Sequence, residues 1–357
     1  MKKRVLYVFL AALVCVLPLQ GQQLPDSHFE NWTDKFNGDV QPADWHGSNV
    51  NQVIKSTLLL QKPGRSGFCA YVSNRKVGAM GITEIAPGYF TLGKPWQYIK
   101  GLNTKSATGG TEGGIAWTHR PDTMAVWIKR GGPSTDKEDF NLIYYAWSGT
   151  AKGSQYTAKN GDCTKTDRVN EQCDIRTATN PNACGTDEPA KQVAEGLYTA
   201  RAKHSEWTLI KVPVYYMNST VPTMCNVVFS AGNYPSPGGT EKLFEGNELY
   251  VDDVEMIYSS RIDKLVINGT EWADFDPNSD KVQTYKLPAA GDVKIDALRG
   301  VGSLTSSTGK KVACKGRKLD SKEMTVTPGA VNGAPWVIVV KAEDGSSTHT
   351  YKIKIVG

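Results

Sequence analysis

The chain has 357 residues, of which 39% are hydrophobic, 22% are charged, 35 are glycine and 18 are proline. This length exceeds one typical domain, and glycine and proline stay well below the roughly one quarter that marks low-complexity chains, so disordered and collagen-like proteins are excluded. The formal net charge is +5, but Lys2, Lys3 and Arg4 supply three of these charges. The near balance of the remainder gives no electrostatic footprint for nucleic acid or an anionic membrane.

Residues 1–21 have the pattern of a secretory signal peptide. Three basic residues precede an apolar run over residues 5–17, which is shorter than the roughly 20 residues that span a bilayer. We therefore expect cleavage after Gly21 and export to the periplasm, the cell surface or the extracellular medium. Six cysteines then remain: Cys69, Cys163, Cys173, Cys184, Cys225 and Cys314. They permit up to three disulfides, and their spacings match no zinc site.

Short alternating or uniformly apolar runs recur between turn residues, and no segment carries sustained helical periodicity. We predict strands over residues 68–72, 123–129, 140–147, 207–216, 225–230 and 249–258. A polar stretch over about residues 150–190 interrupts them and is either a functional loop or a surface excursion. The one short helix that we expect lies around residues 188–197.

Composition changes at Ser259-Ser260, after which further strands are expected. They cover residues 265–267, 283–287, 293–297, 322–327, 336–341 and 348–355. Strands without intervening helices indicate antiparallel sandwiches. The sequence therefore predicts an all-β protein with a first sandwich domain over residues 22–259 and an immunoglobulin-like sandwich over residues 260–357.

Catalytic motifs with a characteristic spacing are absent from the sequence. It contains no G-x-S-x-G, no H-E-x-x-H and no phosphate-binding glycine loop, and its five histidines are scattered. A carboxylate pair for glycoside hydrolysis has no fixed sequence spacing, so Glu84, Glu112, Glu138 and Asp139 stay open as candidates. We predict no catalytic residue.

Aromatic residues are more informative, with nine tryptophans and fifteen tyrosines. Aromatic rings stack on the apolar faces of sugars, although a β-sandwich also buries tryptophan in its core. Alternation places Trp127 on the face of its strand opposite the apolar residues. Tyr145 and Trp147 share the more polar face of the next strand. With Trp117, these residues are the candidate carbohydrate-binding side chains.

Two acids interrupt the apolar run Leu249-Tyr250-Val251-Asp252-Asp253-Val254, and Glu30 lies between aromatic residues in Phe29-Glu30-Asn31-Trp32. A buried carboxylate is costly unless it is paired or binds a metal, and calcium prefers oxygen ligands. A structural calcium joining the first and last strands explains both acids. Alternatively, Asp253 points to solvent and Asp252 accepts backbone hydrogen bonds.

Several short motifs of the first domain occur in an order typical of one known family. They are Phe29-Glu30-Asn31-Trp32, Trp45, residues 88–93, 120–127, 207–215 and 227–230, and the run that contains Asp252. With them, the domain resembles the putative carbohydrate metabolism domain (PCMD) family of exported Bacteroidetes proteins. The resemblance implies a jelly-roll β-sandwich similar to carbohydrate-binding modules, with calcium held by Glu30 and Asp252, and it supplies no catalytic residue. The cysteine-bearing stretch departs from the family pattern.

The second domain resembles the cadherin-like or immunoglobulin-like modules of Bacteroidetes glycan-processing proteins. The motifs that carry this resemblance are residues 262–269, Phe275-Asp276-Pro277 and residues 340–345. It implies a spacer or a docking element for cell-surface proteins. Together, these observations predict an exported carbohydrate-binding protein for glycan capture, without catalysis, a membrane span or a nucleic-acid partner. The alternatives are a glycoside hydrolase and a structural or adhesion protein of the cell surface.

Overall fold

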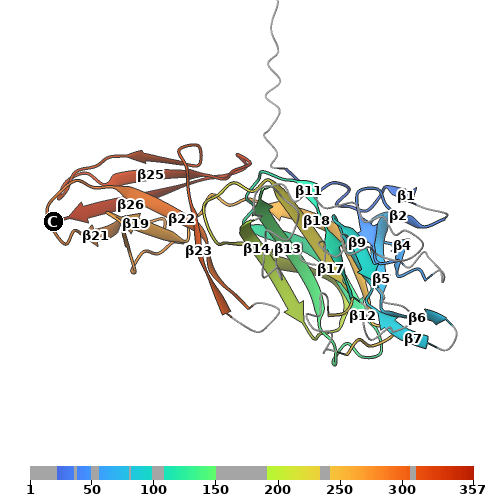
Figure 1. The fold of residues 1–357 in the computed structure, drawn as a ribbon. Helices are drawn as coiled ribbons and strands as arrows, with labels where there is room; N and C mark the ends of the chain where they lie inside the picture. Colours follow the sequence, from blue (N-terminus) through green and yellow to red (C-terminus); the bar gives the residue numbers. More distant parts are fainter. Residues whose placement is uncertain are drawn as a thin grey trace, which may run out of the picture.

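The structure of the chain is a computed structural model that describes residues 22–35, 38–49, 56–79, 82–98, 108–149, 191–233, 242–305 and 311–357. Every regular element in these ranges is a β-strand, so the predicted all-β class is confirmed. The strands form two sandwiches, and the second, drawn in orange to red, lies at one end of the first (Figure 1). The predicted signal peptide and the cysteines at positions 163, 173 and 184 lie outside the described residues.

Two antiparallel sheets form the first sandwich. One consists of β16 (Tyr215–Tyr216), β14 (Lys191–Ala200), β13 (Phe140–Ser148), β17 (Met224–Ser230), β8 (Tyr89–Thr91) and β3 (His46–Gly47) in that order, with β11 (Ile115–Ala116) paired to β17. The other consists of β15 (His204–Pro213), β12 (Thr123–Gly131), β18 (Glu248–Ile257), β5 (Phe68–Ser73) and β4 (Leu59–Pro63) in that order. Because the chain crosses repeatedly between these two sheets, the fold is a jelly roll.

Three further antiparallel pairs lie outside these two sheets. They are β1 (Trp32–Asp34) with β2 (Val40–Pro42), β6 (Arg75–Ala79) with β7 (Ile82–Ala86), and β9 (Lys94–Tyr98) with β10 (Thr108–Glu112).

The core between the two sheets follows from the two-residue period of the strands. In β12, Met124, Val126 and Ile128 are fully buried in this core. Trp45 lies within it, 5.7 Å from the Phe229 ring. Since successive side chains of a strand point to opposite faces, the residues between these core positions are left on the outer face of the five-stranded sheet.

The helix expected around residues 188–197 is wrong, because residues from Lys191 onward form the ten-residue strand β14. β14 pairs with β13 along its whole length. Val193 and Ala194 are fully buried in the core. This pairing and burial outweigh the helical preference of the local sequence, which is a weak determinant of secondary structure.

The three cysteines in the described residues are Cys69, Cys225 and Cys314, and all three are buried free thiols. Burial raises the pKa of the Cys69 thiol to about 12. With these three thiols free, the upper limit of three disulfides allowed by the sequence is not reached.

Two four-stranded sheets form the second sandwich. One consists of β20 (Thr270–Glu271), β19 (Lys264–Ile267), β22 (Ile295–Thr305) and β23 (Lys311–Lys318), and the other of β21 (Gln283–Lys286), β26 (Thr348–Val356), β25 (Trp336–Lys341) and β24 (Met324–Thr327). Only the β21–β26 pair is parallel among these described strands. Leu265, Ile338 and Ile353 are fully buried in its core. This unit is the expected immunoglobulin-like sandwich.

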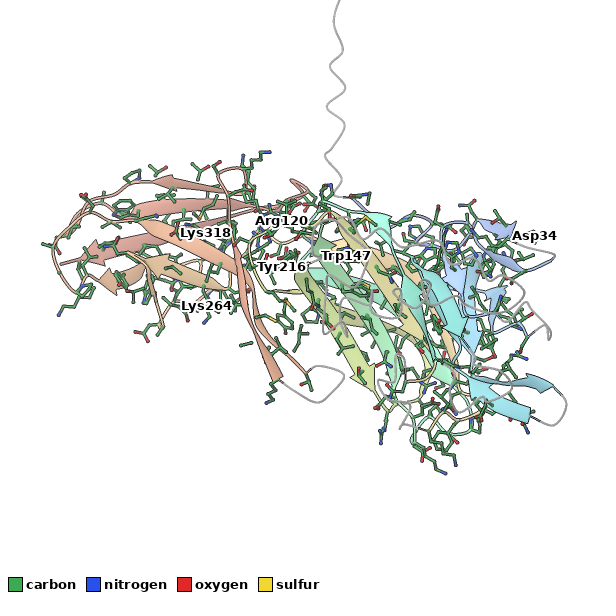
Figure 2. All side chains as sticks on the ribbon, viewed as in Figure 1. Asp34, Arg120, Trp147, Tyr216, Lys264 and Lys318 are labelled. Carbon is green, nitrogen blue, oxygen red and sulfur yellow. The ribbon has the colours of Figure 1, made fainter. Side chains whose placement is uncertain are left out.

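Close packing joins the two sandwiches where β16 meets β22. A Cβ atom at Gly302 would lie 2.2 Å from Tyr215 Cε1, and one at Gly300 would lie 2.3 Å from Tyr216 Cδ2. Glycine at both positions therefore lets the two tyrosines lie directly against the backbone of β22. Figure 2 shows Tyr216 and Arg120 at this junction.

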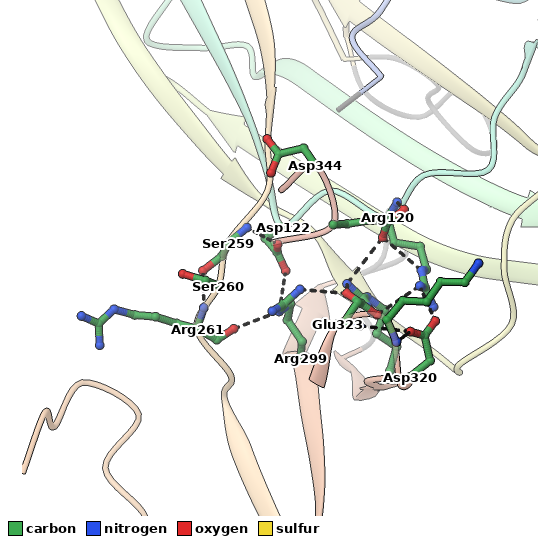
Figure 3. Close-up of polar contacts among 12 residues, drawn as sticks. Arg120, Asp122, Ser259, Ser260, Arg261, Arg299, Asp320, Glu323 and Asp344 are labelled. Atoms are coloured by element: carbon green, nitrogen blue, oxygen red, sulfur yellow. Dashed lines mark hydrogen bonds and ion pairs between the residues drawn. The ribbon is translucent and has the colours of Figure 1, made fainter. Parts of the chain in front are cut away.

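A buried ion cluster lies at the same junction (Figure 3). Glu323 is 3% exposed and accepts two hydrogen bonds from Arg317, at 2.7 and 2.8 Å. Arg299 donates to it at 3.1 Å, and so does Arg120 from the first sandwich, also at 3.1 Å. Burial raises the pKa of Glu323, but the hydrogen bonds and charges of these arginines outweigh burial and hold the pKa below its usual value. Glu323 therefore stays ionised and ties the two sandwiches together.

Asp122 lies at the edge of this cluster and titrates differently. Its Oδ2 accepts a hydrogen bond from Ser259 N at 2.7 Å, and its Oδ1 lies 3.6 Å from Arg299 Nε. Burial raises the pKa of Asp122 to about 6, since the opposing attraction of Arg299 and Arg317 is weaker. Asp122 thus changes charge within the range of pH in which proteins are usually handled.

We expect Asp122→Asn to flatten the pH dependence of stability. Because the folded-state pKa is raised, the contribution of Asp122 is complete below its unfolded-state pKa of about 3.9 and is lost as the pH rises through about 6. The wild type should lose about 1 kcal/mol more unfolding free energy than the variant between about pH 5 and pH 7. Urea unfolding at both pH values measures this, and equal losses in the two proteins would contradict it.

Candidate functional site

The outer face of the five-stranded sheet gathers aromatic side chains from four adjacent strands. Trp207 of β15, Trp127 of β12 and Tyr250 of β18 are partly exposed, and Tyr71 of β5 is 8% exposed. Trp127, Tyr250 and Tyr71 lie between core residues, and Trp207 lies on the side of β15 opposite the buried Ile210 and Val212, so the four rings point away from the core. We call this surface, with its neighbouring side chains, the aromatic face. It consists of Leu60, Lys62, Tyr71, Trp127, Lys129, Trp207, Leu209 and Tyr250.

Strand register places several of these residues in one row across the sheet. Lys129 is the direct partner of Tyr250, Tyr250 of Tyr71, and Tyr71 of Leu60. The rings of Tyr71 and Tyr250 lie 4.7 Å apart at an interplanar angle of 64°. This edge-to-face geometry is favourable for an aromatic pair and keeps both rings in place.

Basic side chains lie over three of the rings. Arg65 Cζ is 3.8 Å from the Trp127 ring, Lys129 Nζ is 5.1 Å from the Trp207 ring, and Lys62 Nζ is 5.5 Å from the Tyr71 ring. These distances suit cation–π attraction. The aromatic face therefore carries both flat apolar surfaces and positive charge.

Hydrogen-bonding groups accompany the rings. The Tyr71 hydroxyl donates to Glu248 Oε2 at 2.9 Å. Burial raises the pKa of Tyr250 to about 12, with further contributions from Glu248 and Tyr71. Its hydroxyl therefore stays protonated. Among the described residues, neither this hydroxyl nor the indole N–H groups of Trp127 and Trp207 have a hydrogen-bond partner, so all three remain as donors for a ligand.

Glu30 and Asp252, the two predicted calcium ligands, both hold the turn between β4 and β5. Glu30 Oε1 accepts a hydrogen bond from Phe68 N at 3.0 Å, and Asp252 Oδ2 accepts one from Arg65 N at 2.7 Å. A Cβ atom at Gly67 would lie 2.2 Å from Glu30 Oε1. The structure thus brings the two acids to one turn, and this turn has no room for a side chain at Gly67.

The same turn reaches the aromatic face through Arg65. Its guanidinium pairs with Asp253 and lies over Trp127, and His28 Nδ1 lies 2.7 Å from Asp253 Oδ1. Burial raises the pKa of Asp252, and the charge of Asp253 adds to the rise, against backbone hydrogen bonds that oppose it. Asp252 and Asp253 therefore hold Arg65 in place, and the Arg65 guanidinium in turn lies over the Trp127 ring.

These contacts allow a test of the calcium prediction. Asp252 Oδ1 accepts Asp253 N at 2.9 Å, so both oxygens of Asp252 already have backbone donors. No group of three acidic, histidine or cysteine side chains able to hold a metal occurs in the ranges that the structure describes. Calcium takes six to eight oxygens, so backbone carbonyls and water would have to supply the rest of its shell. Hydrogen bonds account for both acids without an ion, and calcium stays a prediction.

The four aromatic residues predicted to bind carbohydrate differ in their exposure to solvent. Trp127 is partly exposed on the aromatic face. Trp117, Tyr145 and Trp147 are 1, 3 and 1% exposed. The expectation that Tyr145 and Trp147 face outward is wrong, and Trp117 lies in the main core between the two sheets. None of the three presents a ring face to a ligand.

Burial of both faces of β13 explains this error. All residues from Phe140 to Trp147 are buried, because one face packs in the main core and the other forms a second apolar cluster with Tyr89 and Val228. Asn226 Nδ2 donates to the Tyr145 hydroxyl at 2.8 Å, which satisfies that hydroxyl inside the protein. Alternation of apolar and polar residues identifies an exposed face only in a strand with one face in contact with solvent, and β13 has no such face.

Two of the acids considered for hydrolysis, Glu138 and Asp139, are engaged with other residues of the protein. Glu138 is 2% exposed, and its carboxylate accepts hydrogen bonds from Asn74 Nδ2 and Asn247 Nδ2. Asp139 Oδ1 pairs with Arg201 Nε at 3.0 Å, and Glu84 lies on β7, outside both large sheets. Glu138 therefore fixes loops in place and does not face a ligand.

Sequence reasoning missed Trp207, Tyr250 and Tyr71. The sequence held part of the signal for Trp207. The buried Ile210 and Val212 alternate with Leu209 and Lys211, and the same kind of alternation placed Trp127 on the outer face of its strand. What the sequence lacks is the order of the strands, which places Trp207 beside Trp127 and Tyr71 beside Tyr250.

No family model and no curated protein matches the chain. Among solved structures it is similar to a "putative glycoside hydrolase" of Bacteroides thetaiotaomicron, with 18% identity and a TM-score of 0.42 over 65% of this chain and 70% of that one. It is also similar to a "putative glycoside hydrolase" of Bacteroides vulgatus, with 18% identity and a TM-score of 0.39 over 60% and 85%. A cleaved adhesin domain of Lys-gingipain from Porphyromonas gingivalis shows 13% identity and a TM-score of 0.26 over 64% and 94%. These TM-scores are below 0.5, so the likeness assigns no activity.

We expect Gly67→Ala to destabilise the protein more than Gly113→Ala does. Both glycines have a similar positive φ, 63° and 67°, but nothing lies within 4 Å of a Cβ atom at Gly113. Both variants carry the strain of a positive φ, and Gly67→Ala also displaces Glu30 from Phe68 N, which should add about 1 kcal/mol. Urea unfolding measures the difference. In a Glu30→Ala background the extra cost should vanish, and its persistence there would contradict this account.

The predicted calcium site has its own test. Excess EDTA should lower the melting temperature, and added Ca²⁺ but not Mg²⁺ should restore it, because Mg²⁺ needs a smaller octahedral shell. Glu30→Gln should abolish the effect. A melting temperature that EDTA leaves unchanged would contradict calcium at Glu30 and Asp252.

Proposed function

We propose that the first sandwich binds a polysaccharide on the aromatic face. The observation that carries this proposal is the set of outward aromatic rings on four adjacent strands, Trp207, Trp127, Tyr250 and Tyr71. Neighbouring strands lie about 4.8 Å apart, so the four strands extend over roughly 14 Å. A surface of this length suits an extended chain of sugars better than a single small molecule.

The chemistry of the face also favours a sugar. Sugar rings offer apolar C–H faces and polar hydroxyl edges, and rigid aromatic side chains bind such amphipathic surfaces at low entropic cost. The Tyr250 hydroxyl and the two outward indoles supply donors, and Glu248 supplies an acceptor. Stacking and hydrogen bonding are therefore available on the same surface.

Binding without hydrolysis agrees best with the acids of this face. Glu248 and Asp252 lie four residues apart on β18, roughly 13 Å of extended strand, whereas glycosidases hold their carboxylates about 5–10 Å apart. Asp252 is 1% exposed and bound by backbone N–H groups. Hydrolysis would require a second accessible acid beside Glu248.

Glycan capture outside the cytoplasm completes the proposal. The predicted signal peptide supports export, and the motif resemblance supports membership of the PCMD family. No helix among the described residues is long and apolar enough to cross a membrane. The second sandwich, held to the first by the ion cluster, would present the binding domain as a spacer or dock to a cell-surface protein.

A panel of soluble polysaccharides tests the proposed function. Affinity gel electrophoresis, followed by calorimetry on any polymer that retards the protein, should show binding by the wild type. Trp127→Ala combined with Trp207→Ala should weaken it at least tenfold, or about 1.4 kcal/mol, through loss of two stacking surfaces. Phe68→Ala is the matched control, because Phe68 is 44% exposed and lies on β5 but not on the aromatic face.

Two outcomes would contradict this function. One is the absence of binding to every polymer of the panel. The other is binding that the double variant retains at full affinity. Release of reducing sugar by the wild type would instead support the hydrolase alternative.

A further inference from the structure

Two lysines flank the paired tyrosines at the centre of the aromatic face. Lys129 is the register partner of Tyr250 on one side, and Lys62 lies over the Tyr71 ring on the other. Lys129 belongs to β12 and Lys62 to β4, with β18 and β5 between them. A ligand that lies across the two tyrosine rings would therefore meet an ammonium group at each end of the pair.

The two ammonium groups have no carboxylate partner among the described residues, whereas the nearby acids do have partners. Glu248 accepts the Tyr71 hydroxyl, Asp252 accepts two backbone N–H groups, and Asp253 pairs with Arg65 and His28. The acids thus have hydrogen-bond partners within the protein, whereas Lys62 and Lys129 are left to pair with an anionic group of a ligand.

The end of the face beyond Trp127 is electrically balanced. Lys211 and Glu255 are the two register partners of Ala125, one from each neighbouring strand. Their charges offset each other. By contrast, Lys62 and Lys129 beside the tyrosine pair have no carboxylate within ion-pair distance among the described residues.

From this arrangement we infer that the polysaccharide bound by the aromatic face is acidic, with carboxylate or sulfate groups that pair with Lys62 and Lys129. The inference rests on the proposed function and names its substrate class. A neutral sugar would stack on Tyr71 and Tyr250 but would leave both ammonium groups unused. Charge-assisted hydrogen bonds to an anionic group are about twice as strong as neutral ones. They are also weakened by salt, which gives a second readout.

The test compares pairs of polymers that share a sugar backbone, one polymer of each pair being charged and the other neutral. Polygalacturonate is set against its methyl ester, and dextran sulfate against dextran, so that carboxylate and sulfate are distinguished. In calorimetry at low salt, the wild type should bind at least one acidic polymer at least tenfold more tightly than its neutral counterpart. Raising the salt concentration to about 0.5 M should remove most of that preference.

The variant Lys62→Gln with Lys129→Gln should lose the preference and bind the acidic polymer no more tightly than its neutral counterpart. Lys352→Gln with Lys354→Gln is the control, because these exposed lysines lie on β26 of the second sandwich, and it should keep the preference. Circular dichroism melts verify that both variants fold.

The outcomes separate the two proposals. Equal binding of acidic and neutral polymers, or a preference that survives in the Lys62/Lys129 variant, overturns the inference and leaves polysaccharide binding intact. A preference lost equally in the control variant also overturns it, since the effect would then come from net charge. Binding to none of the polymers overturns the proposed function, and the inference falls with it.

Discussion

Burial of one face of the five-stranded sheet is the constraint on which the rest of the first sandwich depends. Since side chains of a strand alternate between two faces, filling the core with Met124, Val126 and Ile128 forces Trp127 and Lys129 outward. The same condition acts on the neighbouring strands. The aromatic face is thus the necessary counterpart of the core, and its chemistry depends only on which residues occupy the outward positions.

Buried charge and tight backbone packing decide how the second sandwich is held. The carboxylate of Glu323 accepts hydrogen bonds from arginines of β22, of β23 and of the first sandwich, and removal of Glu323 would deprive these buried arginines of their shared partner. Gly300 and Gly302 let Tyr216 and Tyr215 approach the backbone of β22. These specific contacts make the second sandwich a fixed extension of the first, which suits a module that presents a binding face at a distance from its attachment.

Several buried or engaged acids of the described residues serve the structure. Glu138 and Glu323 are buried and fully engaged, and Asp252 with Glu30 holds the β4–β5 turn from which Arg65 reaches Trp127. A buried carboxylate persists only where donors offset its desolvation, and such a group is poorly placed to meet a substrate. The available groups of the aromatic face are mainly rings, ammonium groups and hydroxyls, which favours the proposal of binding over that of hydrolysis.

The sequence by itself determined the all-β class, most strand positions and the outward side of Trp127, because two-residue periodicity is a local property of the chain. It failed at β14, where pairing with β13 overrides a helical pattern, and at β23, whose polar run Lys311–Lys318 has no apolar alternation. It also failed at Trp147, which lies in a strand covered on both faces. Only the tertiary structure placed Trp207, Tyr250, Tyr71 and Lys62 on one sheet face with Trp127 and joined Arg120 to Glu323, because strand order and long-range contacts bring together residues that are distant in the chain.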